Sequence, residues 1–138
     1  MIVADTGAIL ALIDADDRHH LKLRRLYEAD PDSWVLPWAI LPEVDYLVSS
    51  HIGTKAQNAF FEDLTSGAFF VAWGDDDELK RAQKLCARYG SLKLGLVDAV
   101  VITLAERLKA EAIATLDLRH FGVVSIRGAP RLYPRDLP

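Results

Sequence analysis

Residues 1–10 read MIVADTGAIL, and they decide how the rest of the chain is interpreted. The apolar run at residues 2–4 is typical of a short strand buried on both faces, because apolar and polar residues do not alternate in it. Asp5 follows this strand directly, and an apolar helix is expected from Thr6 onward, over GAILALI. In open parallel sheets, ligands bind beyond the carboxyl ends of the strands. A lone carboxylate here therefore predicts a polar site at that edge.

The rest of the chain repeats this pattern of short apolar runs and longer helical segments. Further strands are expected at residues 34–37, 68–73, 112–115 and 123–126. Further helices are expected at residues 18–29, 41–50, 54–64, 75–89 and 96–110. In the segment 18–29, Leu21, Leu23, Leu26 and Tyr27 are expected to face the core. Strands that alternate with helices predict an α/β fold, here a three-layer α/β/α sandwich around a short central parallel sheet.

The composition predicts one folded domain over residues 1–138. Hydrophobic residues make up 51% of the chain and charged residues 26%, as in ordinary soluble globular proteins. The single cysteine, Cys86, excludes an internal disulfide and fits a reducing compartment. The apolar runs are too short to cross a bilayer and no leader segment is visible, so we expect a cytoplasmic protein with no membrane partner.

Two acidic residues follow expected strands. Asp117 comes just after the strand at residues 112–115, as Asp5 comes after the strand at residues 2–4. If these strands are neighbours, the two carboxylates face each other across one edge of the sheet. Each also has a structural alternative, since Asp5 could cap the helix that follows it and Asp117 could start the turn of DLRHFG.

Two more acidic residues lie in apolar surroundings, where an unpaired charge is costly. Asp98 lies in LGLVDAVVITLA, near the start of a helix with a core-facing apolar stripe. Glu43 lies at the edge of the apolar face of the helix at 41–50, whereas Asp45 is expected further round toward solvent. The structural alternatives are a helix-dipole role for Asp98 and a salt bridge for Glu43.

The proposed convergence of Asp5, Glu43, Asp98 and Asp117 points to metal chemistry. Converging carboxylates repel one another, and all-oxygen anionic sites suit hard divalent cations such as Mg²⁺ or Mn²⁺. The net charge of −4 argues against broad, non-specific affinity for nucleic acid. Two divalent ions would cancel the four carboxylate charges, so a phosphodiester would not be repelled from the site.

Four segments of the chain resemble a known family. VADTGAIL, PEVDYLV, GLVDAVVITLAERL and ATLDLRHF are similar, in order and spacing, to segments of the PIN domain, in particular of the VapC-like toxins of prokaryotic toxin–antitoxin pairs. This resemblance implies that Asp5, Glu43, Asp98 and Asp117 hold Mg²⁺ or Mn²⁺ for endoribonuclease chemistry. It also implies a parallel-sheet α/β/α fold, an RNA substrate, a homodimer, and an inhibiting antitoxin whose segment occupies the cleft.

One residue departs from the family's pattern. Pro42 directly precedes Glu43, where the family usually has residues compatible with a helix interior. Proline is tolerated in a first helical turn, so the helix is expected either to start at Pro42 or to kink there, which affects the aim of Glu43.

Several polar residues accompany the four acids. Thr6 and Thr115 place hydroxyls beside Asp5 and Asp117, where they could orient the carboxylates. Arg119 and His120 are candidate contacts for RNA phosphate, with a solvated loop as the alternative. The run DDDE at 75–78 is expected to cap a helix rather than bind metal.

Competing activities fit the residues less well. A haloacid-dehalogenase-like phosphatase requires Asp-x-Asp after the first strand, but Gly7 stands at the third position. A receiver domain requires a lysine after its fifth strand, and no lysine follows Lys109. The remaining alternative is a PIN-like module that binds RNA or protein without cutting. The sequence therefore favours a Mg²⁺- or Mn²⁺-dependent endoribonuclease of the toxin type.

Overall fold

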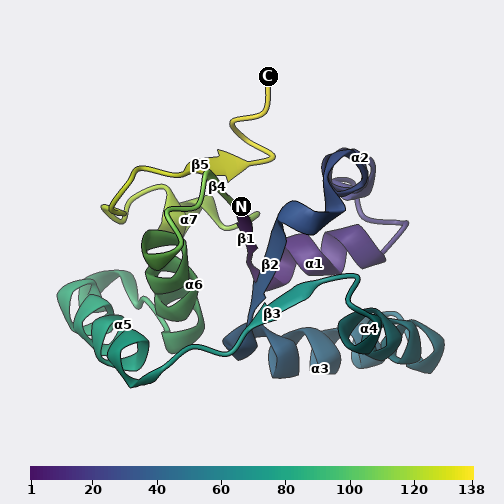
Figure 1. Ribbon diagram of the computed structural model, residues 1–138, viewed down its shortest axis with the longest axis horizontal. Coiled ribbons are helices and arrows are strands. Elements are labelled where there is room, and N and C mark those ends of the chain that lie inside the picture. Colours follow the sequence, from purple (N-terminus) through teal and green to yellow (C-terminus); the bar gives the residue numbers. More distant parts are fainter.

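The computed structural model describes residues 1–138 and contains one sheet of five parallel strands (Figure 1). The strands are β1 (Ile2–Ala4), β2 (Trp34–Pro37), β3 (Phe70–Ala72), β4 (Ala112–Ala114) and β5 (Arg131–Tyr133). Their order across the sheet is β3-β2-β1-β4-β5, so β1 is the central strand and lies between β2 and β4. All three residues of β1 and of β4 are buried, as expected for strands covered on both faces.

Seven α-helices surround the sheet. They are α1 (Thr6–Ile13), α2 (His20–Ala29), α3 (Leu41–His51), α4 (Thr54–Ser66), α5 (Asp76–Arg88), α6 (Leu96–Arg107) and α7 (Leu118–Phe121). Short 3₁₀ turns, η1 (Pro31–Ser33), η2 (Trp38–Ile40) and η3 (Gly90–Leu92), precede β2, α3 and α6. Helices α1–α4 gather on one side of the sheet, and α5 and α6 pack together on the other (Figure 1). The predicted three-layer α/β/α sandwich is confirmed.

Local sequence explains where several helices begin and end. Asp75 caps α5 by accepting a hydrogen bond from the backbone N–H of Glu78 at 2.9 Å, so the predicted capping role of the DDDE run is confirmed. Helix α4 ends at Gly67, whose φ of 86° is the left-handed conformation that glycine adopts at low cost. Helix α3 begins at Leu41, so Pro42 lies within its first turn, where proline is tolerated.

The expected strand at residues 123–126 is wrong. The backbone N–H groups of Val123 and Val124 both donate to the carbonyl oxygen of His120, and these residues form a turn after α7. The edge position beside β4 is taken instead by β5, in which Arg131 pairs with Ala112. The apolar run at 123–126 is mistaken for the edge strand, because the true edge strand is less apolar. An edge strand can carry an exposed charged residue, and β5 begins with the exposed Arg131.

Three smaller expectations also fail. Leu21 is 64% exposed, because it lies two residues from the fully buried Leu23 and so points away from the core. Asp45 is half-buried rather than solvated, and it accepts a hydrogen bond from Gln57 Nε2 at 2.6 Å. The strand expected at 68–73 is shorter, and its Phe70 is 65% exposed because β3 is an edge strand. No helix is both long and apolar enough to span a membrane.

The interior position of β4, between β1 and β5, predicts a large cost for truncating its core residue. Ile113 is completely buried between β1 and β5. Ile113→Ala should lower the free energy of unfolding by about 2–5 kcal/mol, because it removes buried methyl groups and leaves a cavity. Val123→Ala, at a side chain that is 62% exposed, should change it by less than about 0.5 kcal/mol. Urea denaturation measures both, and equal losses would contradict the placement of these segments.

Candidate metal centre

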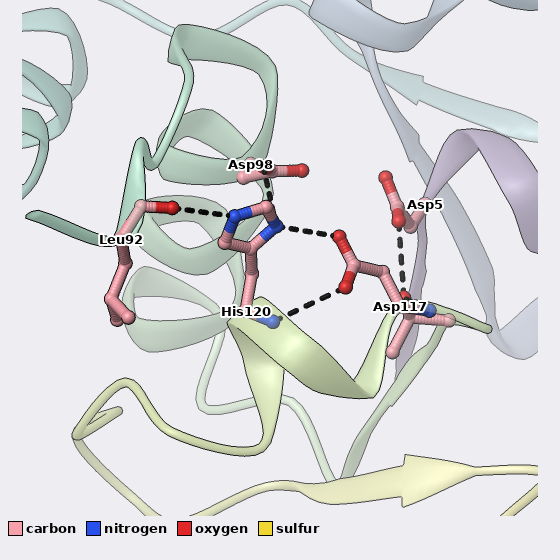
Figure 2. Close-up of polar contacts among 6 residues, drawn as sticks. Asp5, Leu92, Asp98, Asp117 and His120 are labelled. Carbon is pink, nitrogen blue, oxygen red and sulfur yellow. Dashed lines mark hydrogen bonds and ion pairs between the residues drawn. The ribbon is translucent and has the colours of Figure 1, made fainter. Parts of the chain in front are cut away.

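The pairing of β1 with β4 brings two predicted site residues to one edge of the sheet. Ala4 pairs with Ala114, and the backbone N–H of Asp5 donates to the carbonyl oxygen of Ala114 at 2.9 Å. The prediction that these two strands are neighbours is confirmed. Figure 2 shows the carboxylates of Asp5, Asp98 and Asp117 pointing into one region, with the ring of His120 beside them.

Asp5 is the most buried acid of this group, with 7% of its surface exposed. Burial raises its pKa to about 6, and the nearby charges of Asp98 and Glu43 act in the same direction. Hydrogen bonds from the backbone N–H of Thr6 and from the hydroxyl of Thr115 oppose this shift without cancelling it. The carboxylate of Asp5 is therefore poorly stabilised in the protein alone.

The two threonines differ in what they contact. Thr115 is buried, and its hydroxyl donates to Asp5 Oδ2 at 3.0 Å while accepting from the backbone N–H of Asp117 at 3.0 Å. One side chain thus ties the acids of β1 and β4 together. The hydroxyl of Thr6 is also buried, beside Asp5, but it has no hydrogen-bond partner.

Asp98 lies in the first turn of α6, which follows Gly95. Burial raises its pKa above the ordinary value, as do the charges of Asp117 and Glu43, whereas the proximity of His120 lowers it. A carboxylate at a helix N-terminus is favoured by the helix dipole, so the local sequence explains its place on the helix. The local sequence does not explain its approach to other acids.

Asp117 and His120 form a tightly connected pair. Asp117 caps α7, since its Oδ1 accepts from the backbone N–H of His120 at 3.2 Å, and its Oδ2 lies 2.7 Å from His120 Nδ1. Burial alone would raise the pKa of Asp117, but the hydrogen bonds from His120 outweigh this and lower it. The same contact raises the pKa of His120, with help from the carbonyl group of Leu92.

His120 does not lie in the solvated loop that the sequence suggested. Only 8% of its surface is exposed, and Nε2 lies 2.8 Å from the carbonyl oxygen of Leu92 in η3. Both ring nitrogens therefore face protein acceptors. The spacing of Asp117 and His120, three residues apart at the start of a short helix, is the signal that sequence reasoning missed.

The remaining predicted residues lie around this cluster. Glu43 is exposed on the first turn of α3, and its charge acts on both Asp5 and Asp98, which places it near both. Pro42 lies in the same first turn, at the start of the helix. Arg119 is exposed on α7, where its charge helps to lower the pKa of Asp117.

This donor set fits a divalent cation. Asp98, Asp117 and His120 each offer a ligand atom, and these atoms lie within 4.8 Å of one another. Burial raises the pKa of Asp5 and of Asp98, and the neighbouring carboxylates raise it further. A divalent ion bound by Asp5, Asp98 and Asp117 would supply the missing positive charge.

The raised pKa of Asp5 makes a prediction for the metal-free protein. Since an aspartate in an unfolded chain titrates near pH 3.9, the folded protein, with Asp5 at a pKa of about 6, binds more protons between these two values. Stability must then fall as the pH rises through this window, by roughly 3 kcal/mol in all. Asp5→Asn should remove this loss and stabilise the metal-free protein at neutral pH. Urea unfolding in EDTA across the window measures it, and identical profiles for both proteins would contradict it.

Comparisons with known proteins agree with the fold. The model of the PIN domain matches residues 2–125. Ribonuclease VapC26 of Mycobacterium tuberculosis is 31% identical over 130 residues, which cover 94% of this chain and 96% of that protein.

Solved structures show the same fold at lower identity. The crystal structure of VapC20 from Mycobacterium tuberculosis, a sarcin–ricin-loop-cleaving toxin, has a TM-score of 0.81 at 21% identity and covers 94% of this chain and 99% of its own. DNA-bound VapBC from Salmonella typhimurium has a TM-score of 0.70 at 19% identity, with 95% of each chain covered. The resemblance found in four sequence segments is confirmed, and the chain belongs to the PIN domain family.

Proposed function

We propose that this protein is a divalent-metal-dependent endoribonuclease that acts as the toxin of a toxin–antitoxin pair. The observation that carries the proposal is the group of ligand atoms offered by Asp98 and Asp117, with the carboxylate of Asp5 pointing into the same region at the carboxyl edge of β1 and β4. Family membership supports the reaction class, since the curated relative at 31% identity is a ribonuclease. VapBC, a solved structural neighbour, supports an antitoxin protein as partner.

In this proposal, three carboxylates hold the metal and the other residues serve them. Asp5, Asp98 and Asp117 bind Mg²⁺ or Mn²⁺, which supplies Lewis-acid stabilisation of the charge that develops on the phosphodiester group during hydrolysis. Thr115 fixes the orientation of Asp5 through its hydroxyl and spaces it from Asp117. The three carboxylates surround one region and would repel a phosphate group on their own. The bound cation attracts the phosphate to this region.

Glu43 and Arg119 are assigned to the substrate side of the site. Both are exposed, unlike Asp5, so solvent and a phosphodiester reach them. In this proposal, the carboxylate of Glu43 orients the attacking water and accepts its proton. The guanidinium of Arg119, whose charge acts on Asp117, contacts a phosphate of the RNA strand in the same proposal.

This proposal also includes four further statements. The ion is Mg²⁺ or Mn²⁺, the protein is a homodimer, it is located in the cytoplasm, and residues 1–138 form a single domain. Each follows from the resemblance or from the composition. The structure supports the last of them, since its buried apolar residues form a continuous core around one sheet.

Metal binding and RNA cleavage test the function together. With Mn²⁺ at about a hundred times its dissociation constant, the wild-type protein should gain about 2.7 kcal/mol of stability, which raises the melting temperature by several degrees. Asp98→Asn should lose most of this gain and should not cleave a pool of cellular RNA that the wild type cleaves. EDTA should abolish cleavage by the wild type.

A matched control is Asp16→Asn, which removes an exposed carboxylate from the loop between α1 and α2. It should keep both the metal response and the cleavage. Metal binding without cleavage of any RNA would favour the non-catalytic binding module. Absence of a metal response in the wild type would contradict the metal-dependent nuclease itself.

A further inference from the structure

We propose that His120 is itself a ligand of the divalent metal, so that the centre combines carboxylate oxygens with one imidazole nitrogen and prefers first-row transition ions to Mg²⁺. The inference rests on the proposed function, because it concerns the same ion. It adds a nitrogen ligand to a site that the four acids alone would make entirely of oxygen.

The position of the ring is the first support. His120 Nδ1 lies 2.7 Å from Asp117 Oδ2 and 3.6 Å from Asp98 Oδ2, and the three ligand atoms lie within 4.8 Å of one another. Ligand atoms about 2.1 Å from a common ion lie at most about 4.2 Å apart. The three side chains are thus already close to the separation that one shared ion requires.

The hydrogen bond at the far side of the ring is the second support. Nε2 lies 2.8 Å from the carbonyl oxygen of Leu92, which can only accept, so Nε2 carries a hydrogen. In the neutral ring, the free lone pair is then on Nδ1, the nitrogen that faces Asp98 and Asp117. Histidines that bind metals usually donate their other ring N–H to a carbonyl or carboxylate group in this way.

In the metal-free protein, Nδ1 faces two carboxylates and lies 2.7 Å from Asp117 Oδ2. Because a carboxylate only accepts, this contact puts a hydrogen on Nδ1 as well as on Nε2, so the ring is the doubly protonated imidazolium until a metal binds. A metal ion takes the place of the hydrogen on Nδ1, which is released to solvent, as happens when ligands of metal sites lose their protons on binding. The ring needs little rearrangement, because it is 8% exposed and is held both by Leu92 and by its place on α7.

The other histidines lack this arrangement. Nδ1 of His20 lies 2.9 Å from the carbonyl oxygen of Ala11, and Nδ1 of His51 lies 3.1 Å from that of Leu47. His19 contacts the side chain of Arg18. His120 alone forms ion pairs with carboxylates, so a nitrogen ligand at this centre has one source.

A nitrogen ligand changes which ions the site selects. Mg²⁺ takes oxygen ligands and keeps much of its water, whereas imidazole is a good ligand of first-row transition ions. His120→Gln should therefore weaken Mn²⁺ binding by at least about tenfold and weaken Mg²⁺ binding less, as measured by isothermal titration calorimetry. Equal losses for both ions would mean that His120 only positions Asp117, and would overturn the inference.

Electron spin-echo spectroscopy of Mn²⁺ bound to the full chain tests ligation directly. The wild type should show modulation from a coordinated nitrogen, and His120→Gln should lose it at Mn²⁺ concentrations that still fill the site. His20→Gln, which removes a histidine that also contacts a backbone carbonyl group, should keep it. Should His120→Gln fail to fold, wild-type protein labelled with ¹⁵N-histidine must show altered modulation if the ligand is a histidine.

The outcomes separate the two proposals. Bound Mn²⁺ with no nitrogen modulation in the wild type overturns the assignment of His120 and leaves the carboxylate centre in place. Modulation that is unchanged by the ¹⁵N label, or that persists in His120→Gln, also overturns it. Failure of the wild type to bind Mn²⁺ at all would overturn the metal-dependent function and the ligand assignment together.

Discussion

The burial of carboxylates at one edge of a sheet, close to other acids, is the constraint on which the rest of this structure depends. Asp5 is carried to that edge by the central strand β1, and it is buried there with its pKa raised to about 6. The charges of Asp98 on α6 and of Glu43 on α3 raise the pKa of Asp5 further. Burying these carboxylates together costs stability, and a bound cation would offset this cost. The cluster is therefore best understood as a site that a cation completes.

The surrounding groups reduce this cost without removing it. The hydroxyl of Thr115 bonds Asp5 and receives the N–H of Asp117, so neither strand end is left without partners. His120 lies against Asp98 and Asp117 and is anchored to the loop before α6 through Leu92. These contacts hold Asp5, Asp117 and His120 in place, as the proposed metal site would require.

Much of this could be predicted from the sequence because the relevant signals are local. Apolar runs without alternation identified β1, β2 and β4, and the position of Asp5 and Asp117 after two of them indicated a shared edge. The segment at 123–126 and Leu21 show where local signals fail. Whether an apolar residue is buried depends on what packs against it, and at sheet edges and short helices the sequence pattern is too short to decide.

The sequence by itself determined the alternation of strands and helices, the acids that follow β1 and β4, and the family. The tertiary structure alone decided how these acids interact. It placed Glu43 close enough to Asp5 and Asp98 to act on both, and it turned His120 inward against Asp117 and Leu92. Those relations join residues far apart along the chain, between β1, α3, α6 and α7. They depend on how helices pack around the sheet, which spacing in a single segment does not encode.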